Sequence, residues 1–595
     1  MVKLSEVPAH AGLELVKNIV RIYDAITYPI YFVIQCPWIK KRKYDRIRAV
    51  QEDPSNPYSS WVRVGQPPEM IIDKCTTIDE IMRTCIDVYK DRNCMGYRTL
   101  LEEIEEKQPD GKIHIKKRLA PEYTFLSYRE VGVRMDHIMR GLLLSGVQPG
   151  DKLIIFMETR MEWMLTAQAL YRMGGCVATV YATLGDEGVV HVINEVGSSH
   201  LLTSADLLPK LKNISHKLHD LKTVIYLEDH IKPKAKSEHG FDETGLRLIR
   251  FEDMETEGRN APEDLVGKAP KPEDIALIMY TSGSTGVPKG VMAWHRNYVA
   301  ALQSLYTVFP EFDVKEGDWD MAFLPLAHNL EFTKEHLEFA LGMAVAYATP
   351  LTLTDTSPGL APGTRGDIML VRPSVFIAVP LILDRIRKTV TDKIEQKGKF
   401  AQLLFEYIVD YKNYWVGLGF DTPIVNFLVS RKIREGLGGK LRGVFCGGAP
   451  LSPATQRFAR ACLDVVVMQG YGTTETTAVA TLMDLFDWTE GRTGAPVFGT
   501  KVRLIDWEEG GYRPTDKPRP RGEVVVGGPS ITAGYFKQDD VTAEVYREED
   551  GIRWFYTGDI GEFYPDGTLK IIDRRKDLLK LSFGEYVSLG KVRTP

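Results

Sequence analysis

A regular alternation of amphipathic helices and short apolar strands runs through the chain from residue 123 onward. Residues 127–146, "SYREVGVRMDHIMRGLLLSG", have helical periodicity and end at a glycine, and "DKLIIFME" (151–158) follows as a buried strand. The same rhythm continues with a helix over 161–175 and a strand over 176–183. Strands that alternate with helices form parallel βαβ units. We therefore predict an α/β fold built from layered, mostly parallel subdomains.

The later part of the chain keeps this rhythm but also contains a different unit. Strand patterns recur at "ALIMYTSGS", "SVFIAVP", "LRGVFCGGAP" and "DVVVMQGYG". Residues 501–528, "KVRLIDWEEGGYRPTDKPRPRGEVVVGG", instead combine short strands with turn residues and an E-E-G-G hairpin signal. We predict a small antiparallel β subdomain there, inside one large domain over 51–573. The charge-rich stretch from Asp229 to Glu273 is expected to be a surface excursion.

The segment 280–292, "YTSGSTGVPKGVM", follows the apolar run "IALIM" and combines three glycines with two serines, two threonines and one lysine. Glycine lets backbone N–H groups approach a ligand closely, including at positive φ. Hydroxyl donors and a single cation add to a phosphate cradle. The segment is not a Walker A loop, because Pro288 stands five residues after Gly283, where that motif requires glycine.

Together with this loop, four further segments resemble the ordered motifs of the adenylate-forming enzymes, the superfamily of acyl-CoA synthetases, adenylation domains and beetle luciferases. The segments are "LPLAHNLE" (324–331), "GGAPLSP" (447–453), "QGYGTTET" (469–476) and "YTGDIGEFYPDGTLKIIDRRKD" (556–577). With "GEYVSLG" (584–590), the resemblance is closest to long-chain fatty-acid–CoA ligases of the animal endoplasmic-reticulum type. It covers the chain from about residue 75.

The resemblance implies a two-step reaction that uses ATP, Mg²⁺ and coenzyme A. A long-chain fatty acid attacks the α-phosphate of ATP to give an acyl-adenylate and pyrophosphate, and the thiol of coenzyme A then displaces AMP. The first step brings two anions together, so positioning and charge neutralisation dominate the catalysis.

The resemblance also implies which residues contact the nucleotide. The phosphates would lie against Thr281, Ser282, Gly283, Ser284, Thr285, Gly286 and Lys289. The adenine would lie between Gly448, Ala449 and Pro450 on one side and Gln469, Gly470, Tyr471, Gly472 and Thr473 on the other. Tyr471 would stack on the base. Asp559 offers two acceptor oxygens that suit the ribose hydroxyls, and Arg574 offers a planar fork of donors for ribose or α-phosphate oxygens.

Three residues are implied in catalysis: His328, Thr474 and Glu475. Glu475 would bind Mg²⁺, a hard cation that prefers carboxylate oxygens and bridges phosphates. Thr474 would donate a hydrogen bond to a phosphate oxygen. His328 would lie beside the reacting carboxylate, where an imidazole steadies developing charge; without the resemblance, a single histidine beside an apolar helix is more often structural. Asn329 stands where the family usually has an apolar residue.

Residues 25–39, "AITYPIYFVIQCPWI", are uncharged and rich in aromatic side chains, and "KKRK" follows directly. The run is shorter than the ~20 residues that a spanning helix needs, and two prolines interrupt it. We predict that residues 1–50 form a membrane-embedded or interfacial anchor, with aromatic rings at headgroup depth. The alternative is a helix that packs on the main domain. A cleaved signal peptide is disfavoured, because no small-residue cleavage site follows.

The family continues past "GEYVSLGK" into a small mobile α+β domain, whereas this sequence ends at "VRTP". Residues 574–595 are therefore expected to be a hinge, with Lys576 at the hinge position, and the start of a truncated C-terminal domain. On that basis the alternative function is a nucleotide- and fatty-acid-binding isoform with impaired catalysis.

The charge balance of the chain disfavours nucleic-acid binding. The formal net charge is −5, whereas nucleic-acid-binding domains are usually clearly basic. The seven cysteines include no C-x-x-C pair and suggest neither disulfides nor a zinc site. We expect the cytosolic face of the endoplasmic reticulum membrane, or a lipid droplet or another organelle membrane.

Overall fold

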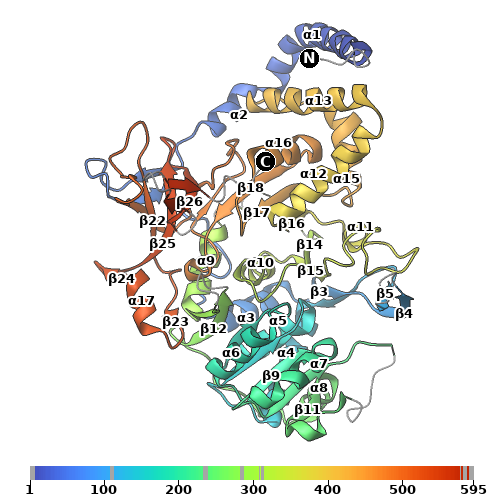
Figure 1. The fold of residues 1–595 in the computed structure, drawn as a ribbon, viewed down its shortest axis with the longest axis vertical. Coiled ribbons are helices and arrows are strands. Elements are labelled where there is room, and N and C mark those ends of the chain that lie inside the picture. Colours follow the sequence, from blue (N-terminus) through green and yellow to red (C-terminus); the bar gives the residue numbers. More distant parts are fainter. Residues whose placement is uncertain are drawn as a thin grey trace.

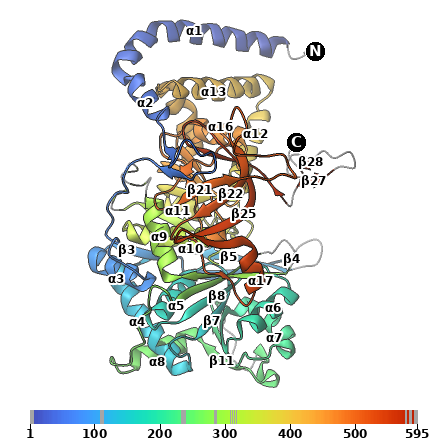
Figure 2. The same cartoon turned by 90° about the vertical axis from the view of Figure 1, so that its left-hand side faces the viewer.

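The computed structural model describes residues 7–107, 113–231, 239–281, 287–306, 309, 312, 314–315 and 317–575, together with the backbone of strands β27 (Leu578–Lys580) and β28 (Tyr586–Ser588). Figures 1 and 2 show an elongated molecule, with an α/β body at one end and two long helices at the other. Lys576 lies outside the described residues.

The body at the lower end of Figure 1 is built on an eight-stranded sheet in the order β11-β10-β9-β7-β8-β12-β13-β23. The strands from β11 to β12 are parallel, and the last two pairs are antiparallel. Their bounds are β7 (Lys152–Phe156), β8 (Cys176–Val180), β9 (His200–Ser204), β10 (Thr223–Leu227), β11 (Arg247–Arg250), β12 (Ile275–Thr281), β13 (Lys289–Trp294) and β23 (Gly534–Tyr535).

Helices cover both faces of this sheet, so its strands are apolar on both sides. The covering helices are α3 (Ile78–Tyr89), α4 (Tyr128–Ser145), α5 (Met161–Arg172), α6 (Asp186–Val196), α7 (Leu208–Ile214) and α8 (Phe251–Asn260). Successive residues of β7 enter different cores: Leu153 and Ile155 pack with α4 and α5, and Ile154 and Phe156 pack with α6 and α7. This alternation follows from the two-residue period of a strand.

Two smaller sheets lie between the body and the long helices. One has the order β16-β17-β18-β19-β20, in which the first three strands are parallel. The other has the order β14-β15-β3-β6. The bounds are β16 (Val375–Ala378), β17 (Gly443–Cys446), β18 (Val466–Tyr471), β19 (Thr481–Leu482), β20 (Ala495–Pro496), β14 (Trp319–Ala322), β15 (Ala344–Tyr347), β3 (Asn93–Tyr97) and β6 (Thr124–Ser127). The hairpin β4 (Leu100–Lys107) and β5 (Ile113–Leu119) projects at one side.

The predicted antiparallel β unit is present and is larger than predicted. It is a seven-stranded sheet that includes β21 (Lys501–Ile505), β22 (Arg521–Gly527), β24 (Tyr546–Glu549), β25 (Ile552–Phe563) and β26 (Leu569–Arg574). Two short strands from the other end of the chain, β1 (Ala49–Gln51) and β2 (Trp61–Arg63), complete it. The layered α/β architecture with a small β region is thus confirmed.

The N-terminal segment forms a long helix, α1 (Val7–Gln35), which continues through Pro29. A second helix, α2 (Pro37–Tyr44), begins at Pro37, after Cys36 turns the chain with a φ of 46°. Figures 1 and 2 place α1 beside α13 (Lys399–Gly417). Of the two predicted interruptions, only the one at Pro37 ends a helix. Within the described residues, no helix is both long and apolar enough to cross a membrane.

The expectation of a surface excursion over 229–273 is wrong for residues 247–260. These residues form β11 and α8, and α8 buries Phe251 and Met254 against the body. Small residues make this close packing possible: a Cβ on Gly258 would lie 1.9 Å from the carbonyl oxygen of His137 on α4.

Candidate active site

The predicted phosphate loop connects two neighbouring antiparallel strands, β12 and β13. Thr281, the last residue of β12, is the cross-strand partner of Lys289, the first residue of β13. Ser282, Gly283, Ser284, Thr285 and Gly286 lie outside the described residues. The strand register therefore fixes where the loop leaves the sheet and where its lysine returns to it.

Lys289 is linked to Glu475 through the tyrosine of the next strand. The ammonium group of Lys289 lies 5.3 Å from the ring centre of Tyr535 on β23. The hydroxyl of Tyr535 donates a 2.8 Å hydrogen bond to Oε1 of Glu475. Burial, together with the negative charge of Glu475, raises the pKa of Tyr535, so the hydroxyl keeps its proton and remains a donor.

Glu475 lies in a short 3₁₀ turn, Thr474–Thr476, which follows the carboxyl end of β18. Its backbone carbonyl accepts hydrogen bonds from the N–H (3.0 Å) and the hydroxyl (3.1 Å) of Thr532. Asn297 holds the segment just before Thr532 through bonds from Nδ2 to the carbonyls of Pro529 and Ile531. Glu475 and its hydrogen-bond partner Tyr535 are thus both held by the segment around Thr532.

The predicted adenine-binding segments lie at the carboxyl ends of two paired parallel strands, β17 and β18. Cys446 pairs with Gln469 in the register, so residues 448–450 follow the end of β17 next to 470–473, of which 470 and 471 still pair with β19. Ligands of open α/β sheets bind at this edge. Gly448, Ala449 and Pro450 are exposed, and Gly448 has a φ of 79°. Gly472 allows a close approach, because a Cβ there would lie 2.2 Å from the carbonyl oxygen of Ala478.

Tyr471, Asp559 and Arg574 form a hydrogen-bonded chain. The hydroxyl of Tyr471 donates to Oδ2 of Asp559 at 2.6 Å, and Nε of Arg574 donates to Oδ1 at 2.9 Å. Asp559 on β25 and Arg574 on β26 are direct cross-strand partners. Burial, with the Asp559 carboxylate beside it, raises the pKa of the Tyr471 hydroxyl. The structure therefore brings together three residues that the sequence assigned to the base and the ribose.

His328 is the N-cap of helix α10 (Asn329–Ala340). Its Nδ1 accepts a 3.1 Å hydrogen bond from the backbone N–H of Leu330. Burial lowers the pKa of His328, which favours the neutral imidazole. With Nδ1 acting as an acceptor, the proton of the neutral ring resides on Nε2. The ring thus offers one N–H donor at the start of the helix.

Asn329 connects this helix to the turn that carries the catalytic candidates. Its Nδ2 donates to the carbonyl oxygen of Thr474 at 3.4 Å, and its Oδ1 accepts a 2.8 Å bond from the hydroxyl of Tyr298 on α9 (His295–Leu305). The side chain is buried. An apolar residue at this position could make neither contact, which gives the departure from the usual pattern a structural role.

Behind His328, α10 buries an unusual group of charges. Nζ of Lys334 lies 2.9 Å from Asp320 and 3.0 Å from Glu331. Burial raises the pKa of Glu331 to about 7, and burial also raises the pKa of Glu335 and of Glu338. One lysine therefore faces four carboxyl groups, and protonation of some of them keeps the cluster from carrying a large net charge.

The residues at this edge fit a nucleotide with a metal ion. The side-chain oxygens Oε1 of Gln469 and Oγ1 of Thr473 are buried and have no hydrogen-bond partner among the described residues. The same part of the chain contains no cluster of three or more His, Cys, Asp or Glu side chains that could hold a metal ion. Mg²⁺ is commonly bound by one or two carboxylates plus substrate phosphates, which a single Glu475 beside a phosphate loop would provide.

The sequence did not point to Tyr535, Asn297 or Tyr298 as parts of this site. None of the three lies in a motif, and each acts through a contact between segments that are far apart in the chain. Asn329 was noticeable only as a departure from the pattern. The pairing of β13 with β23, which brings Tyr535 to Lys289, joins residues about 240 positions apart.

The sequence and the fold are similar to those of known proteins. The model of the AMP-binding enzyme family matches residues 101–536. Long chain acyl-CoA synthetase 8 of Arabidopsis thaliana is 42% identical over 519 residues, which are 86% of this chain and 71% of that protein. Long-chain-fatty-acid–CoA ligase 1 of Schizosaccharomyces pombe is 34% identical over 544 residues, which are 88% of this chain and 78% of that protein.

Solved structures share the fold at lower sequence identity. The adenylation domain of a carboxylate reductase from Mycobacterium chelonae matches with a TM-score of 0.69 and 22% identity, over 88% of this chain and 75% of that one. The corresponding domain from Segniliparus rugosus, solved in complex with AMP and a co-purified carboxylic acid, matches with the same TM-score and identity, over 79% of its own length.

Proposed function

Because the chain belongs to the AMP-binding enzyme family, and within it to the long-chain acyl-CoA synthetases, we propose that it activates long-chain fatty acids with ATP and transfers them to coenzyme A. The fatty-acid carboxylate attacks the α-phosphate of ATP, and pyrophosphate leaves. The thiol of coenzyme A then attacks the acyl-adenylate, and AMP leaves. The observation that supports this most strongly is the connected arrangement of Lys289, Tyr535 and Glu475 at the strand end to which the predicted phosphate loop returns.

The residues of the site suit the first step because they oppose the repulsion between two anions. Lys289 supplies a positive charge at the return of the loop, and Glu475 would hold Mg²⁺, which supplies further positive charge against the phosphates when bound. His328 would donate from Nε2 to the oxygen on which charge develops. Since Asn329 ties the start of α10 to Thr474, His328 and the turn that contains Glu475 are held in a fixed position relative to each other.

The nucleotide would be oriented by the β17–β18 edge and by the β25–β26 hairpin. Tyr471 would stack on the adenine, and Asp559 would accept hydrogen bonds from the ribose hydroxyls. Both oxygens of Asp559 also accept bonds from the protein, so the carboxylate is held in one orientation before the sugar arrives. Such pre-organisation lowers the entropy cost of binding.

For the finer assignments, we propose a relative of the animal endoplasmic-reticulum type, which acts at the cytosolic face of that membrane and attaches through its N-terminal segment. The apolar surface of α1 and the basic residues of α2 support attachment to a lipid surface. Immunofluorescence of the full chain against organelle markers tests the location. Staining confined to the cytosol would contradict it.

Fatty-acid-dependent exchange of labelled pyrophosphate into ATP tests the proposed activity, because it reports the first step without coenzyme A. We expect exchange with oleate and Mg²⁺, and loss of exchange in Lys289→Ala and Glu475→Gln. Lys152→Ala, a lysine on β7 of the same sheet, is the matched control. Saturable ATP binding without exchange would instead support the impaired binding isoform, and formation of oleoyl-CoA in a second assay reports the thioester step.

A further inference from the structure

Helix α1 exposes a continuous apolar stripe. Its members are between 52% and 70% exposed, and their spacing of three or four residues places them on one face of the helix. The stripe consists of Leu15, Ile19, Ile22, Ile26, Ile30 and Val33. Contiguous exposed apolar surface of this kind marks a site of interaction with another apolar surface.

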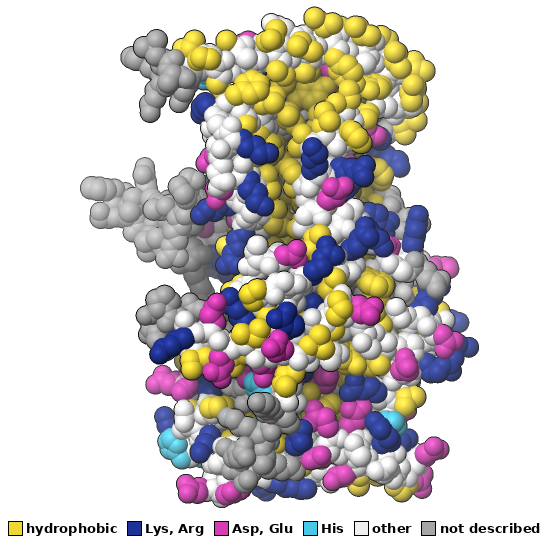
Figure 3. Space-filling view, turned by 90° about the vertical axis from the view of Figure 1, so that its right-hand side faces the viewer, with side chains coloured by type: hydrophobic (Ala, Val, Ile, Leu, Met, Phe, Trp, Pro, Cys, Tyr) yellow, Lys and Arg dark blue, Asp and Glu magenta, His cyan; other side chains and the backbone are white. Residues whose placement is uncertain are grey.

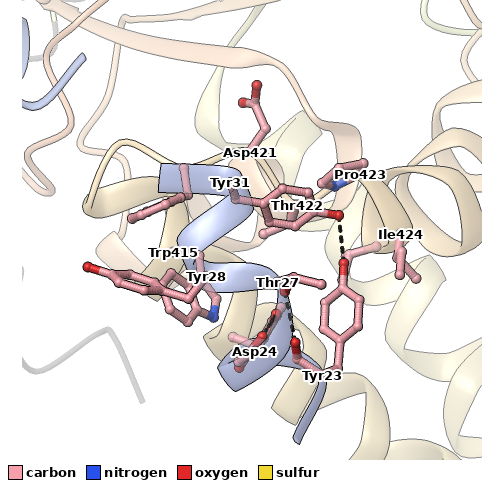
Figure 4. Close-up of a pocket in the computed structure, with 13 residues that line it drawn as sticks. Tyr23, Asp24, Thr27, Tyr28, Tyr31, Trp415, Asp421, Thr422, Pro423 and Ile424 are labelled. Atoms are coloured by element: carbon pink, nitrogen blue, oxygen red, sulfur yellow. Dashed lines mark hydrogen bonds between the residues drawn. The ribbon is translucent and has the colours of Figure 1, made fainter. Parts of the chain in front are cut away.

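The other face of α1 packs against the protein through both apolar and polar side chains, with Leu13 buried. Asp24 accepts a 2.6 Å hydrogen bond from the hydroxyl of Tyr411 on α13, and Lys17 lies 5.9 Å from the ring centre of Tyr407. Figure 4 shows Asp24 and Thr27 on the side of the helix that lines a pocket with residues of the α13 region. Because this face packs on the protein, the apolar stripe on the other face remains exposed.

A second apolar surface adjoins the stripe and comes from a part of the chain almost 400 residues later. After α13, the chain turns through α14 (Pro423–Val425), a π-helical turn (Asn426–Ser430) and α15 (Arg431–Glu435). Phe427 and Leu428 are 65% and 54% exposed at this turn, and Tyr414 on α13 is 64% exposed. In the space-filling view, apolar side chains cover the end of the molecule formed by α1 and α13 (Figure 3).

The two surfaces are fixed to each other, so they form one unit. The rings of Tyr28 and Phe420 lie 5.6 Å apart, and Lys40 forms a 3.0 Å ion pair with Asp421. In addition, the amide of Gln35 donates to the carbonyl of Asp421, and its oxygen accepts from the backbone N–H of the same residue. Another molecule or membrane that contacts the stripe of α1 would therefore also contact the α13–α15 segment.

Basic side chains border this apolar surface. Lys40, Lys41, Arg42 and Lys43 are consecutive on α2, and Arg431 and Lys432 open α15 next to Phe427. Figure 3 shows Lys and Arg side chains below the apolar end. An apolar face with a basic border complements a bilayer that carries anionic headgroups.

We propose that the α13–α15 segment, residues 399–435, is a second membrane-contacting element, which together with α1 seats the protein on an anionic bilayer with Phe427 and Leu428 among the acyl chains. This inference rests on the proposed attachment through the N-terminal segment and extends it to a part of the chain that no sequence signal linked to membranes. Two contacts fix the orientation of the protein on the bilayer, which a single helix on a linker could not do.

Co-sedimentation of the full chain with vesicles tests the proposal. The vesicles contain phosphatidylcholine alone or phosphatidylcholine with phosphatidylserine. We expect Phe427→Glu/Leu428→Glu to lower the partition coefficient about tenfold or more, since two large apolar side chains no longer leave water. Ile26→Glu/Ile30→Glu should have a similar effect. The matched control is Val266→Glu/Leu351→Glu, two positions with 65% and 58% exposure on other parts of the molecule.

The outcomes separate the possible occupants of this surface. Vesicle binding of Phe427→Glu/Leu428→Glu equal to that of the wild type overturns the proposal, provided that thermal unfolding shows both proteins folded. A wild-type dimer in light scattering that becomes a monomer in this variant, with vesicle binding unchanged, would assign the surface to a second copy of the chain. Pyrophosphate exchange by the wild type is measured separately, so loss of the proposed activity and loss of the proposed docking are distinguishable.

Discussion

The hydroxyl of Tyr535 donates a 2.8 Å hydrogen bond to the carboxylate of Glu475, while the ring of the same tyrosine lies under the ammonium group of Lys289. One side chain on a two-residue edge strand therefore separates and orients the two charged groups that are proposed to act on the phosphates.

Tyr535→Phe should lower the rate of pyrophosphate exchange about tenfold, because a hydrogen bond to a charged group contributes about 1.5–3 kcal/mol. We expect the largest effect at sub-saturating Mg²⁺, where the orientation of Glu475 limits metal binding. The matched control is Tyr58→Phe, which removes a tyrosine–carboxylate bond to Asp506 on the exposed surface. Equal exchange rates in the two variants would contradict the role of Tyr535.

Asn329→Leu should reduce both stability and exchange, because it leaves the Tyr298 hydroxyl without its acceptor and removes the bond that ties α10 to the Thr474 carbonyl. A buried polar group left unsatisfied costs about 1–3 kcal/mol. Tyr298→Phe is the control, since it removes one of these bonds but keeps Asn329 on Thr474. We expect both variants to unfold at lower temperature, but only Asn329→Leu to lower kcat about tenfold; an equal loss of kcat in both would assign the effect to stability alone.

Much of the fold could be predicted from the sequence, because its signals are local. The period of apolar residues identified α4, β7, α5 and β8, and the glycine at 146 ends α4 with a φ of 105°, as expected for a helix stop. The E-E-G-G turn is also present, with Trp507 bridged to Tyr512 across it. Such features depend on neighbours in the chain, so a pattern alone can indicate them.

The contacts that assemble the site depend on pairings between distant segments, which no local pattern encodes. The sequence indicated that Tyr471, Asp559 and Arg574 belong to one site only through resemblance, and it gave no sign that they bond to one another. In the same way, the uncharged run over 25–39 was visible in the sequence, but its partner α13 could not be inferred.

Asp559→Asn should raise the KM for ATP about tenfold, with a smaller effect on kcat, because the amide accepts fewer hydrogen bonds and loses the ion pair with Arg574. The measurement is the dependence of exchange on ATP concentration at saturating oleate. Glu549→Gln, which removes an ion pair with Arg503 in the same sheet, is the control. An unchanged KM for Asp559→Asn would exclude Asp559 from nucleotide binding.

Lys334→Met should destabilise the protein by about 3–5 kcal/mol, the usual cost of removing one partner from a buried charge cluster. The variant leaves Asp320 and Glu331 facing each other without a cation. Denaturant unfolding measures the change. Lys116→Met, which breaks a more exposed pair with Glu106, should cost less than about 1 kcal/mol. A similar small loss for Lys334→Met would show that the carboxyl groups are neutral without the lysine.

His336 should make stability depend on pH. Its Nδ1 donates to the carbonyl of Phe332, and Gln168 bonds to Nε2, so the buried ring fits the neutral form. Burial lowers the pKa of His336 from 6.5 to about 4. Below pH 6.5 the unfolded chain therefore binds a proton that the folded protein does not bind, and acidification favours unfolding.

Relative to His336→Gln, the wild type should lose on the order of 3 kcal/mol between pH 6.5 and 4, given about 1.36 kcal/mol per pKa unit. Urea unfolding at several pH values measures the difference between the two proteins, and His216→Gln at an exposed position is the control. Parallel stability curves for the wild type and His336→Gln would contradict the assignment.

The apolar stripe of α1 has a practical consequence for the purification of this protein. Removing the helix would expose the aromatic side chains that it contacts, Tyr411, Trp415 and Phe420. The exposed apolar stripe of α1 would then be replaced by another exposed apolar surface. Replacing the outward residues of the stripe with lysine or glutamate would instead remove this apolar surface, while the helix would still cover its neighbour.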